Sequence, residues 1–144
     1  MNPEPWNEET LKKYRNLTSD HTDKLLDNGY GSCVFRHSDI RKILSESLWY
    51  YHGKSYYIDS YVIMPNHLHI LVRMIGNTKV HEVFSNIKNY TARLINARLQ
   101  LSGRFWQREN FDRIVRSEDA YKHYRNYIIN NPRNLPNSQY ELYY

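Results

Sequence analysis

The chain has almost no cysteine: Cys33 is the only one among 144 residues, so no disulfide can form within it. Long apolar runs are also lacking, and no stretch approaches the roughly 20 apolar residues of a membrane-spanning helix. The segment from Met1 to Trp6 lacks the basic and apolar regions of a signal peptide. Together these absences predict a soluble, cytoplasmic protein with no membrane partner.

Repeats, low-complexity segments and a visible domain boundary are absent too, and 144 residues are enough for one domain with a real core. Lysine and arginine number 20 against 15 acidic residues, and the net charge of +5 favours an anionic partner. Tyrosine occurs 14 times. Aromatic rings among basic side chains can stack on unpaired bases, but tyrosines also fill the edge of a core, so composition leaves both interpretations open.

The most informative stretch runs from Tyr61 to Val72 and reads as two strands joined by a tight turn. Pro65 fixes φ at the first central position of the turn, and Asn66 can adopt the backbone conformation that the second position requires. Strand-forming apolar residues lie on both sides of the turn. Side chains alternate faces along a strand, so His67 and His69 point the same way. Neutral imidazoles in this arrangement can share one divalent metal ion, although a His-x-His pair by itself is more often the solvated face of a sheet.

Other elements are predicted from capping residues, apolar spacing and residue content. Helices are expected at residues 38–51, at about 78–101, and from 117 until Pro132 disfavours further turns. The hairpin strands are expected at 56–63 and 67–74, and one more strand or strand pair at 105–115. Residues 8–26 show a helical tendency, 28–31 predict a turn, and 32–35 a small strand or extended arm.

The last predicted helix presents two polar side chains together. Tyr121, Tyr124 and Ile128 recur at the spacing of a stripe that packs on a sheet, whereas Tyr127 lies off its edge. Asn131 follows four residues later on the same flank, so a phenol and a carboxamide lie near the helix end. Periodicity alone favours a packing tyrosine and an ordinary capping asparagine.

Three blocks, in their order along the chain, resemble the single-tyrosine HUH transposases and, among them, the REP-associated tyrosine transposases. Tyr61 to Val72 is similar to the family's Met-Pro-Asn-His-hydrophobic-His signature. Phe105 to Arg108, followed by Asp112 and Arg116, resembles its Trp-Gln-Arg block, and Tyr127 to Pro132 resembles the end of its tyrosine-bearing helix. The likeness covers about residues 28–134.

The resemblance implies an enzyme that nicks single-stranded DNA and transfers the strand. By that likeness His67, His69 and Asn131 hold a divalent metal, Mg²⁺ or Mn²⁺, and Tyr127 attacks a phosphodiester to leave a 5′-phosphotyrosine and a free 3′-OH. The partner is single-stranded or hairpin DNA, which would place the protein at the nucleoid. Six basic side chains are expected to contact phosphates and one aromatic ring to stack: Lys88, Arg93, Arg104, Arg108, Arg113, Arg116 and Trp106.

The resemblance also implies an α+β fold, with a ferredoxin-like antiparallel sheet, helices on one face and the HUH residues on the other. Members begin with an extra apolar strand before the helix near residue 40, and no good candidate occurs before Cys33. That strand is therefore expected to be missing or to be substituted by residues 32–35 or by a partner chain in a homodimer. On this interpretation residues 1–30 are a polar, helical extension, 31–134 the transposase-like domain and 135–144 a C-terminal tail.

Two other functions compete with the nicking enzyme. A shortened, non-catalytic descendant would bind structured nucleic acid without cleaving it. A structural interaction domain would have histidines that face solvent by chance, and the coincidence of three motif blocks argues against it. A covalent protein–DNA adduct distinguishes the enzyme from the binding protein.

Overall fold

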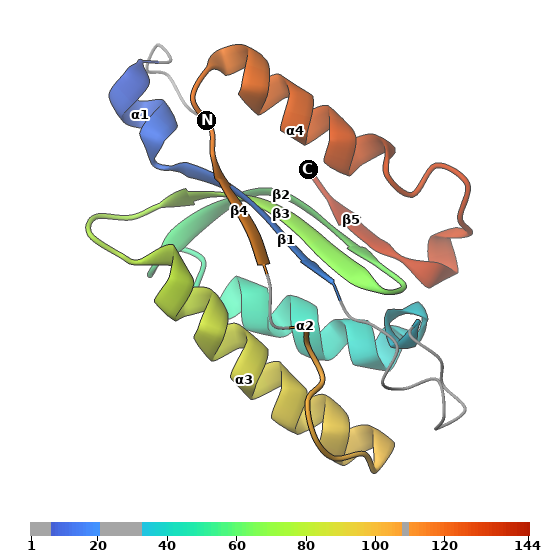
Figure 1. The fold of residues 1–144 in the computed structure, drawn as a ribbon. Helices are drawn as coiled ribbons and strands as arrows, with labels where there is room; N and C mark the ends of the chain where they lie inside the picture. The colour runs from blue at the N-terminus through green and yellow to red at the C-terminus, as the bar shows by residue number, and fades with distance from the viewer. Residues whose placement is uncertain (1–6, 21–32, 108–109) are drawn as a thin grey trace.

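A computed structural model describes residues 7–20, 33–107 and 110–144, which form one sheet with helices packed on it (Figure 1). The helices are α1 (Glu8–Lys12), α2 (Ser38–Tyr50), α3 (Val80–Leu99) and α4 (Glu118–Asn130), with short 3₁₀ helices η2 (Val34–Arg36) and η3 (Asn137–Gln139). The strands are β1 (Tyr14–Asp20), β2 (Tyr56–Met64), β3 (His67–Met74), β4 (Asn110–Ile114) and β5 (Glu141–Tyr143). Within the described ranges, no helix is both long and apolar enough to cross a membrane.

The sheet has the strand order β4-β1-β3-β2-β5, and every neighbouring pair is antiparallel. β2 and β3 form the predicted hairpin, in which Pro65 and Asn66 make the turn and Met64 lies opposite His67. The predicted α+β class with an antiparallel sheet is therefore confirmed.

The expectation that the first strand is missing or substituted is wrong. β1 lies inside the sheet between β3 and β4, and it pairs with β3 from Tyr14 opposite Arg73 to Asp20 opposite His67. The sequence of β1 does not look like a strand because Leu17 is its one aliphatic residue. Leu17 is also the only residue of β1 that packs in the larger hydrophobic cluster. A central strand usually shows a longer apolar run, so a local pattern could not identify this one.

The segments beside β1 also differ from expectation. Of the helix predicted over residues 8–26, the described part up to Asp20 forms only α1, after which the chain continues as β1. The small strand or arm expected at 32–35 is instead η2 from Val34 onward. Residues 21–32, with the predicted turn at 28–31, lie outside the described part of the chain.

Helices cover both faces of the sheet, which corrects the expectation that they share one (Figure 1). On one face, α2 and α3 bury residues such as Leu44 and Phe84 in one cluster with Leu68 of β3. On the other face, Ile128 of α4 packs in a second cluster with Leu71. The alternation of side chains along β3 divides them between the two clusters, so the histidines of this strand lie on the face that α4 covers.

Residues 135–144, expected as a tail, add β5 to the edge of the sheet beside β2. The hydroxyl of Tyr61 donates a hydrogen bond to Glu141 of β5 and accepts one from Nε1 of Trp49 on α2 at 3.1 Å. The C-terminal segment therefore pairs with a strand that lies about 80 residues earlier in the chain, and no local pattern marks it as a strand.

Candidate functional site

β3 presents both predicted histidines to the face beneath α4. His67 lies opposite Met64 and His69 opposite Val62, and these two β2 residues pack in the cluster that contains Ile128 of α4. Side chains directly opposite each other in a sheet share a face. His69 is buried, with 6% of its surface exposed, whereas His67 is partly exposed. His67 therefore lies at the partly exposed edge of the site, and His69 lies buried within it.

His69 is held at one ring nitrogen only. Its Nδ1 lies 2.6 Å from Oγ1 of Thr18, the residue directly opposite it in β1. Its Nε2 is buried and has no hydrogen-bond partner among the described residues. Burial, with a smaller contribution from the charge of His67, lowers the pKa of His69 to about 4. The ring is therefore neutral at pH 7, which is the form that binds a metal ion.

α4 places Tyr127 against this histidine. The two ring centroids lie 4.9 Å apart, with the ring planes inclined at 48°. Tyr121, Tyr124 and Ile128 pack on the sheet, as their spacing predicts, and Tyr127 lies off that stripe with 52% of its surface exposed. A phenol that solvent can reach therefore lies beside the buried imidazole.

A carboxylate of β2 anchors the helix that carries Tyr127. The hydroxyl of Tyr121 donates a hydrogen bond to Oδ1 of Asp59 at 2.5 Å, and Nε of Arg125 lies 3.6 Å from Oδ2 of the same residue. Asp59 stands where the register of β2 against β3 shifts, and such an irregularity can re-aim a side chain out of the regular pleat. The anchor fixes α4 on the sheet of its own chain.

Asn131 caps α4 one turn after Tyr127, and both residues line a pocket of about 440 Å³. The Nδ2 atom of Asn131 is buried and has no hydrogen-bond partner among the described residues. Arg133 and His123 line the same pocket. An anionic group that enters it would meet the phenol, the carboxamide and a guanidinium together.

His67, His69 and Asn131 carry atoms of the kind that ligate a divalent cation. The buried Nε2 of His69 is a ligand atom that lacks a partner, and rotation of the Asn131 carboxamide by half a turn exchanges its nitrogen for an oxygen. Nδ1 of His67 lies 2.9 Å from Oδ1 of Asn66, and when Nδ1 donates to this amide oxygen, the ring carries its lone pair on Nε2. Among the described residues, no three His, Cys, Asp or Glu side chains are placed to hold a metal ion together, so a third protein ligand would have to be of another type, such as Asn131.

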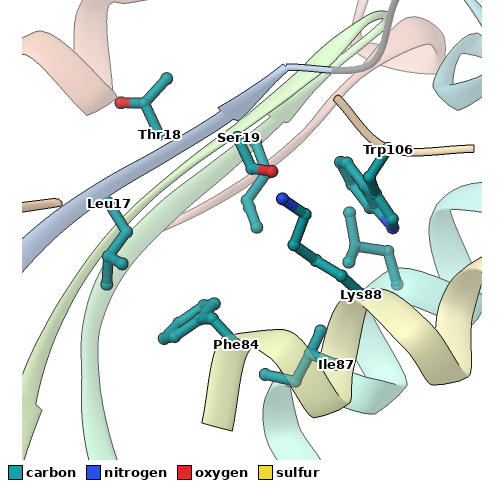
Figure 2. Close-up of a pocket in the computed structure, with 9 residues that line it drawn as sticks. Leu17, Thr18, Ser19, Phe84, Ile87, Lys88 and Trp106 are labelled. Carbon is teal, nitrogen blue, oxygen red and sulfur yellow. The ribbon is translucent and has the colours of Figure 1, made fainter. Parts of the chain in front are cut away.

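The predicted DNA-contacting residues are spread over several surfaces. Lys88 and Arg104 line a pocket of about 520 Å³ between α3 and the segment that follows it. Figure 2 shows Lys88 reaching from α3 toward Ser19 of β1. Its Nζ donates a hydrogen bond to the carbonyl oxygen of Gln107 at 3.1 Å, and burial, assisted by the charge of Arg104, lowers the pKa of Lys88. These two cations lie on the face of the sheet opposite to the histidines.

The other predicted arginines have different surroundings. Arg93 lines a groove of about 680 Å³ between α2 and α3. Arg113 of β4 lies opposite Asn16 of β1, on the same face as His69, and Arg116 follows that strand; both arginines are exposed. Arg108 lies outside the described residues.

The expectation that Trp106 is a stacking platform for DNA is wrong. Only 5% of its surface is exposed, and its ring packs on Phe35 with centroids 5.5 Å apart. Its Nε1 donates a hydrogen bond to Oγ1 of Thr91 at 2.9 Å. The strand predicted over residues 105–115 begins only at Asn110, so Trp106 precedes it and fills the core beside α3.

Two residues near His69 were not found from the sequence. Thr18 lies beside the histidine in β1, and Phe111 of β4 lies opposite Thr18 on its other side with 54% of its surface exposed. A cross-strand row therefore runs from Phe111 through Thr18 to His69. Thr18 and Phe111 belong to no sequence motif near a histidine. They could have been identified only if β1 had been recognised as a strand and its register against β3 and β4 had been known.

Residues 30–131 match the family described as "Transposase IS200 like". The fold resembles that of a REP-associated tyrosine transposase bound to a REP hairpin, with a TM-score of 0.61 and 17% identity over 92% of this chain and 73% of that one. A candidate transposase from Deinococcus radiodurans R1 is similar at a TM-score of 0.44 and 15% identity, over 81% of this chain and 88% of that one. No curated protein matches the chain in sequence. Because the family match spans well over half of the residues, the chain belongs to the IS200-like transposase family.

Proposed function

We propose that this protein nicks and rejoins single-stranded DNA in a reaction that requires Mg²⁺ or Mn²⁺, with Tyr127 as the nucleophile. The observation that carries the proposal is the contact between Tyr127 and His69 within one chain, where the ring centroids lie 4.9 Å apart. His67, His69 and Asn131 would hold the metal. Membership in a transposase family supports DNA as the substrate.

The chemistry balances without an external energy source. A bond forms between Oη of Tyr127 and phosphorus, and the bond from phosphorus to the 3′ oxygen breaks. The phenol gives up its proton to solvent, and the departing 3′ oxygen takes up a proton from solvent. The products are a 5′-phosphotyrosine and a 3′-OH, and attack by another 3′-OH reverses the step. Bound to the three ligands, a divalent metal would supply polarisation of the phosphate and stabilise the developing negative charge.

The face that carries His69 also offers a path for an unpaired strand. Phe111 and Arg113 project from β4 to this face, the first exposed and aromatic, the second exposed and cationic. A base can stack on the ring while the guanidinium meets a phosphate. Phe111 would therefore perform the stacking role expected of Trp106.

Hairpin DNA is the partner that the similar structure supports, since that transposase is bound to a REP hairpin. The pocket lined by Lys88 and Arg104 offers two cations to further phosphates. Tyr127 and His69 meet within one chain, so the proposal needs no second copy to supply the nucleophile. The non-catalytic alternative loses its main argument, because β1 is present in the sheet.

The proposal is tested by incubating the protein with hairpin-bearing single-stranded DNA and Mn²⁺ and resolving the mixture on a denaturing gel. Wild-type protein should form a covalent adduct, and Tyr127→Phe should form none while its DNA affinity stays within about 1 kcal/mol of wild type. Tyr90→Phe removes a hydroxyl from another exposed tyrosine, 47% exposed on α3, and should keep the adduct. An adduct in Tyr127→Phe would refute the nucleophile, and tight binding of several hairpins by wild type without any adduct would favour the non-catalytic binding protein.

The metal ligands are tested separately by titration of Mn²⁺ into the protein without DNA. Wild type should bind the ion weakly, and the double variant His67→Ala, His69→Ala should bind it less than wild type by at least tenfold, because two of three ligands are removed. Equal binding by the two proteins would reject the site.

A further inference from the structure

Thr18 has the closest polar contact to His69 in the described part of the chain. The two residues are direct partners in the antiparallel pairing of β1 with β3, and Oγ1 of Thr18 lies 2.6 Å from Nδ1 of the ring. Figure 2 shows Thr18 on the opposite side of β1 from Leu17 and Ser19, which face α3. The threonine hydroxyl is therefore directed to the face of the histidines by the alternation of the strand.

The contact matters because a neutral imidazole has two forms. One ring nitrogen carries the proton and the other carries the lone pair that a metal ion requires. If Nδ1 of His69 donates to Oγ1 of Thr18, the lone pair lies on Nε2, the buried atom that has no partner among the described residues. In the other form, Nε2 would bear a proton with no acceptor in these surroundings, and a buried unpaired donor is costly.

We propose that Thr18 is a positioning residue that holds His69 in the form protonated on Nδ1, with Nε2 presented to the divalent cation. This inference rests on the proposed function for its metal. Contacts behind a ligand commonly orient the ring and set its tautomer, and their loss typically lowers metal affinity by about 10- to 100-fold. The branched Cβ of threonine suits the role because it restricts χ1 and so keeps the hydroxyl in place.

The position of Thr18 in the fold supports the role. β1 lies outside the segment matched by the family, residues 30–131, so Thr18 belongs to none of the motif blocks. It nevertheless lies between Phe111 and His69 in the cross-strand row, and hydrogen bonds on both sides of β1 fix its backbone. A side chain on a doubly paired strand holds a ring more firmly than one on a loop.

The experiment compares wild type with Thr18→Val and Thr18→Ser. Valine keeps the shape and the branching but lacks the hydroxyl, whereas serine keeps the hydroxyl. Nitrogen-15 NMR of the histidine side chains, recorded at pH 7 on metal-free protein, reports which ring nitrogen of His69 is protonated. Wild type and Thr18→Ser should show the proton on Nδ1, and Thr18→Val should shift the population toward Nε2.

Calorimetric titration of Mn²⁺ into the same proteins gives the second measurement. Thr18→Val should bind the ion about 10- to 100-fold more weakly than wild type, and Thr18→Ser should recover most of the affinity. Ser19→Ala is the matched control, because it removes a hydroxyl from the neighbouring residue on the opposite face and should change neither measurement. If Thr18→Val does not fold, Thr18→Ala replaces it, and the same shift of the proton toward Nε2 and the same weaker binding of Mn²⁺ are expected.

Two outcomes separate this inference from the proposed function. If His69 keeps its proton on Nδ1 in Thr18→Val, the inference is overturned, whatever the metal affinity. If wild-type protein binds no Mn²⁺ but the tautomer still changes in Thr18→Val, the control of His69 by Thr18 is supported and the proposed metal site fails.

Discussion

Replacing Leu17 by alanine should destabilise this protein much more than the same replacement of Leu94. Leu17 lies in β1 with 4% of its surface exposed, packed in the cluster that α2 and α3 form on the sheet. Leu94 lies on α3 with 36% exposed. Both substitutions delete the same three carbon atoms, so the difference in cost reports how deeply each side chain is buried.

The magnitude follows from burial. Three buried carbons at about 0.8 kcal/mol each contribute about 2.4 kcal/mol, and the cavity left in a packed core adds about 1 kcal/mol. Leu17→Ala should therefore lower the free energy of unfolding by about 3 to 4 kcal/mol. For Leu94→Ala the loss should stay below about 1 kcal/mol, because the side chain is partly exposed and alanine is the better helix former. Against a typical stability of about 5–15 kcal/mol, only the first loss is severe.

Urea unfolding followed by circular dichroism measures both values if the slopes of the transitions agree. Equal costs for the two substitutions would refute the central position of β1, since they would mean that Leu17 is no better buried than the partly exposed Leu94 of α3. The same result would remove the support for the contact between Thr18 and His69, because that contact depends on the register of β1.

Three other perturbations test the site and its DNA surface. Phe111→Ala should weaken binding of single-stranded DNA by about 1–3 kcal/mol in fluorescence anisotropy, while Phe111→Tyr should bind like wild type; equal affinity for the alanine variant would exclude stacking. Binding should weaken steeply with salt, at a log–log slope of about −3.5 for five phosphate contacts, and Arg113→Gln should reduce the slope by about 0.7; an unchanged slope would mean that Arg113 contacts no phosphate. In metal-free buffer, stability should fall as the pH drops from 6.5 to 4, because the pKa of His69 is lowered from 6.5 to about 4 by burial and the unfolded chain binds more protons in that window. His69 should account for at most about 3 kcal/mol of this fall in the free energy of unfolding. Urea unfolding of His69→Gln across the same pH range should show a fall that is smaller by that amount. Identical pH profiles for wild type and His69→Gln would contradict the burial of a neutral ring.

Local chemistry made the hairpin and the last helix predictable from the sequence. Pro65 and Asn66 specify a two-residue turn. The alternation of side chains along the strand that follows places His67 and His69 on one face, in agreement with the observed pairing of β2 and β3. Ser117 accepts a hydrogen bond from the amide of Ala120 and so begins α4 where the capping pattern predicts. Each of these features depends on residues within a few positions of one another.

The family could also be inferred from sequence, because its motifs are short runs of fixed spacing. Helical periodicity separates Tyr127 from Tyr121 and Tyr124, which do pack toward the sheet, but only the resemblance of Tyr127 to Pro132 to the family's motif singles out Tyr127 as the candidate nucleophile. Whether Tyr127 is the nucleophile and Asn131 a ligand remains a prediction for the experiments above.

The tertiary structure decided the features that depend on distant pairing. Thr18 and His69 are 51 residues apart in the chain, and only the register of β1 against β3 brings a threonine hydroxyl to the ring. Trp106 looks like a surface aromatic in its polar neighbourhood, yet contacts with Phe35 and Thr91 bury it. The physical reason is common to both: a strand with one aliphatic residue, or an aromatic in an irregular segment, gains its stability from partners that are remote in sequence, and such partners leave no local pattern to read.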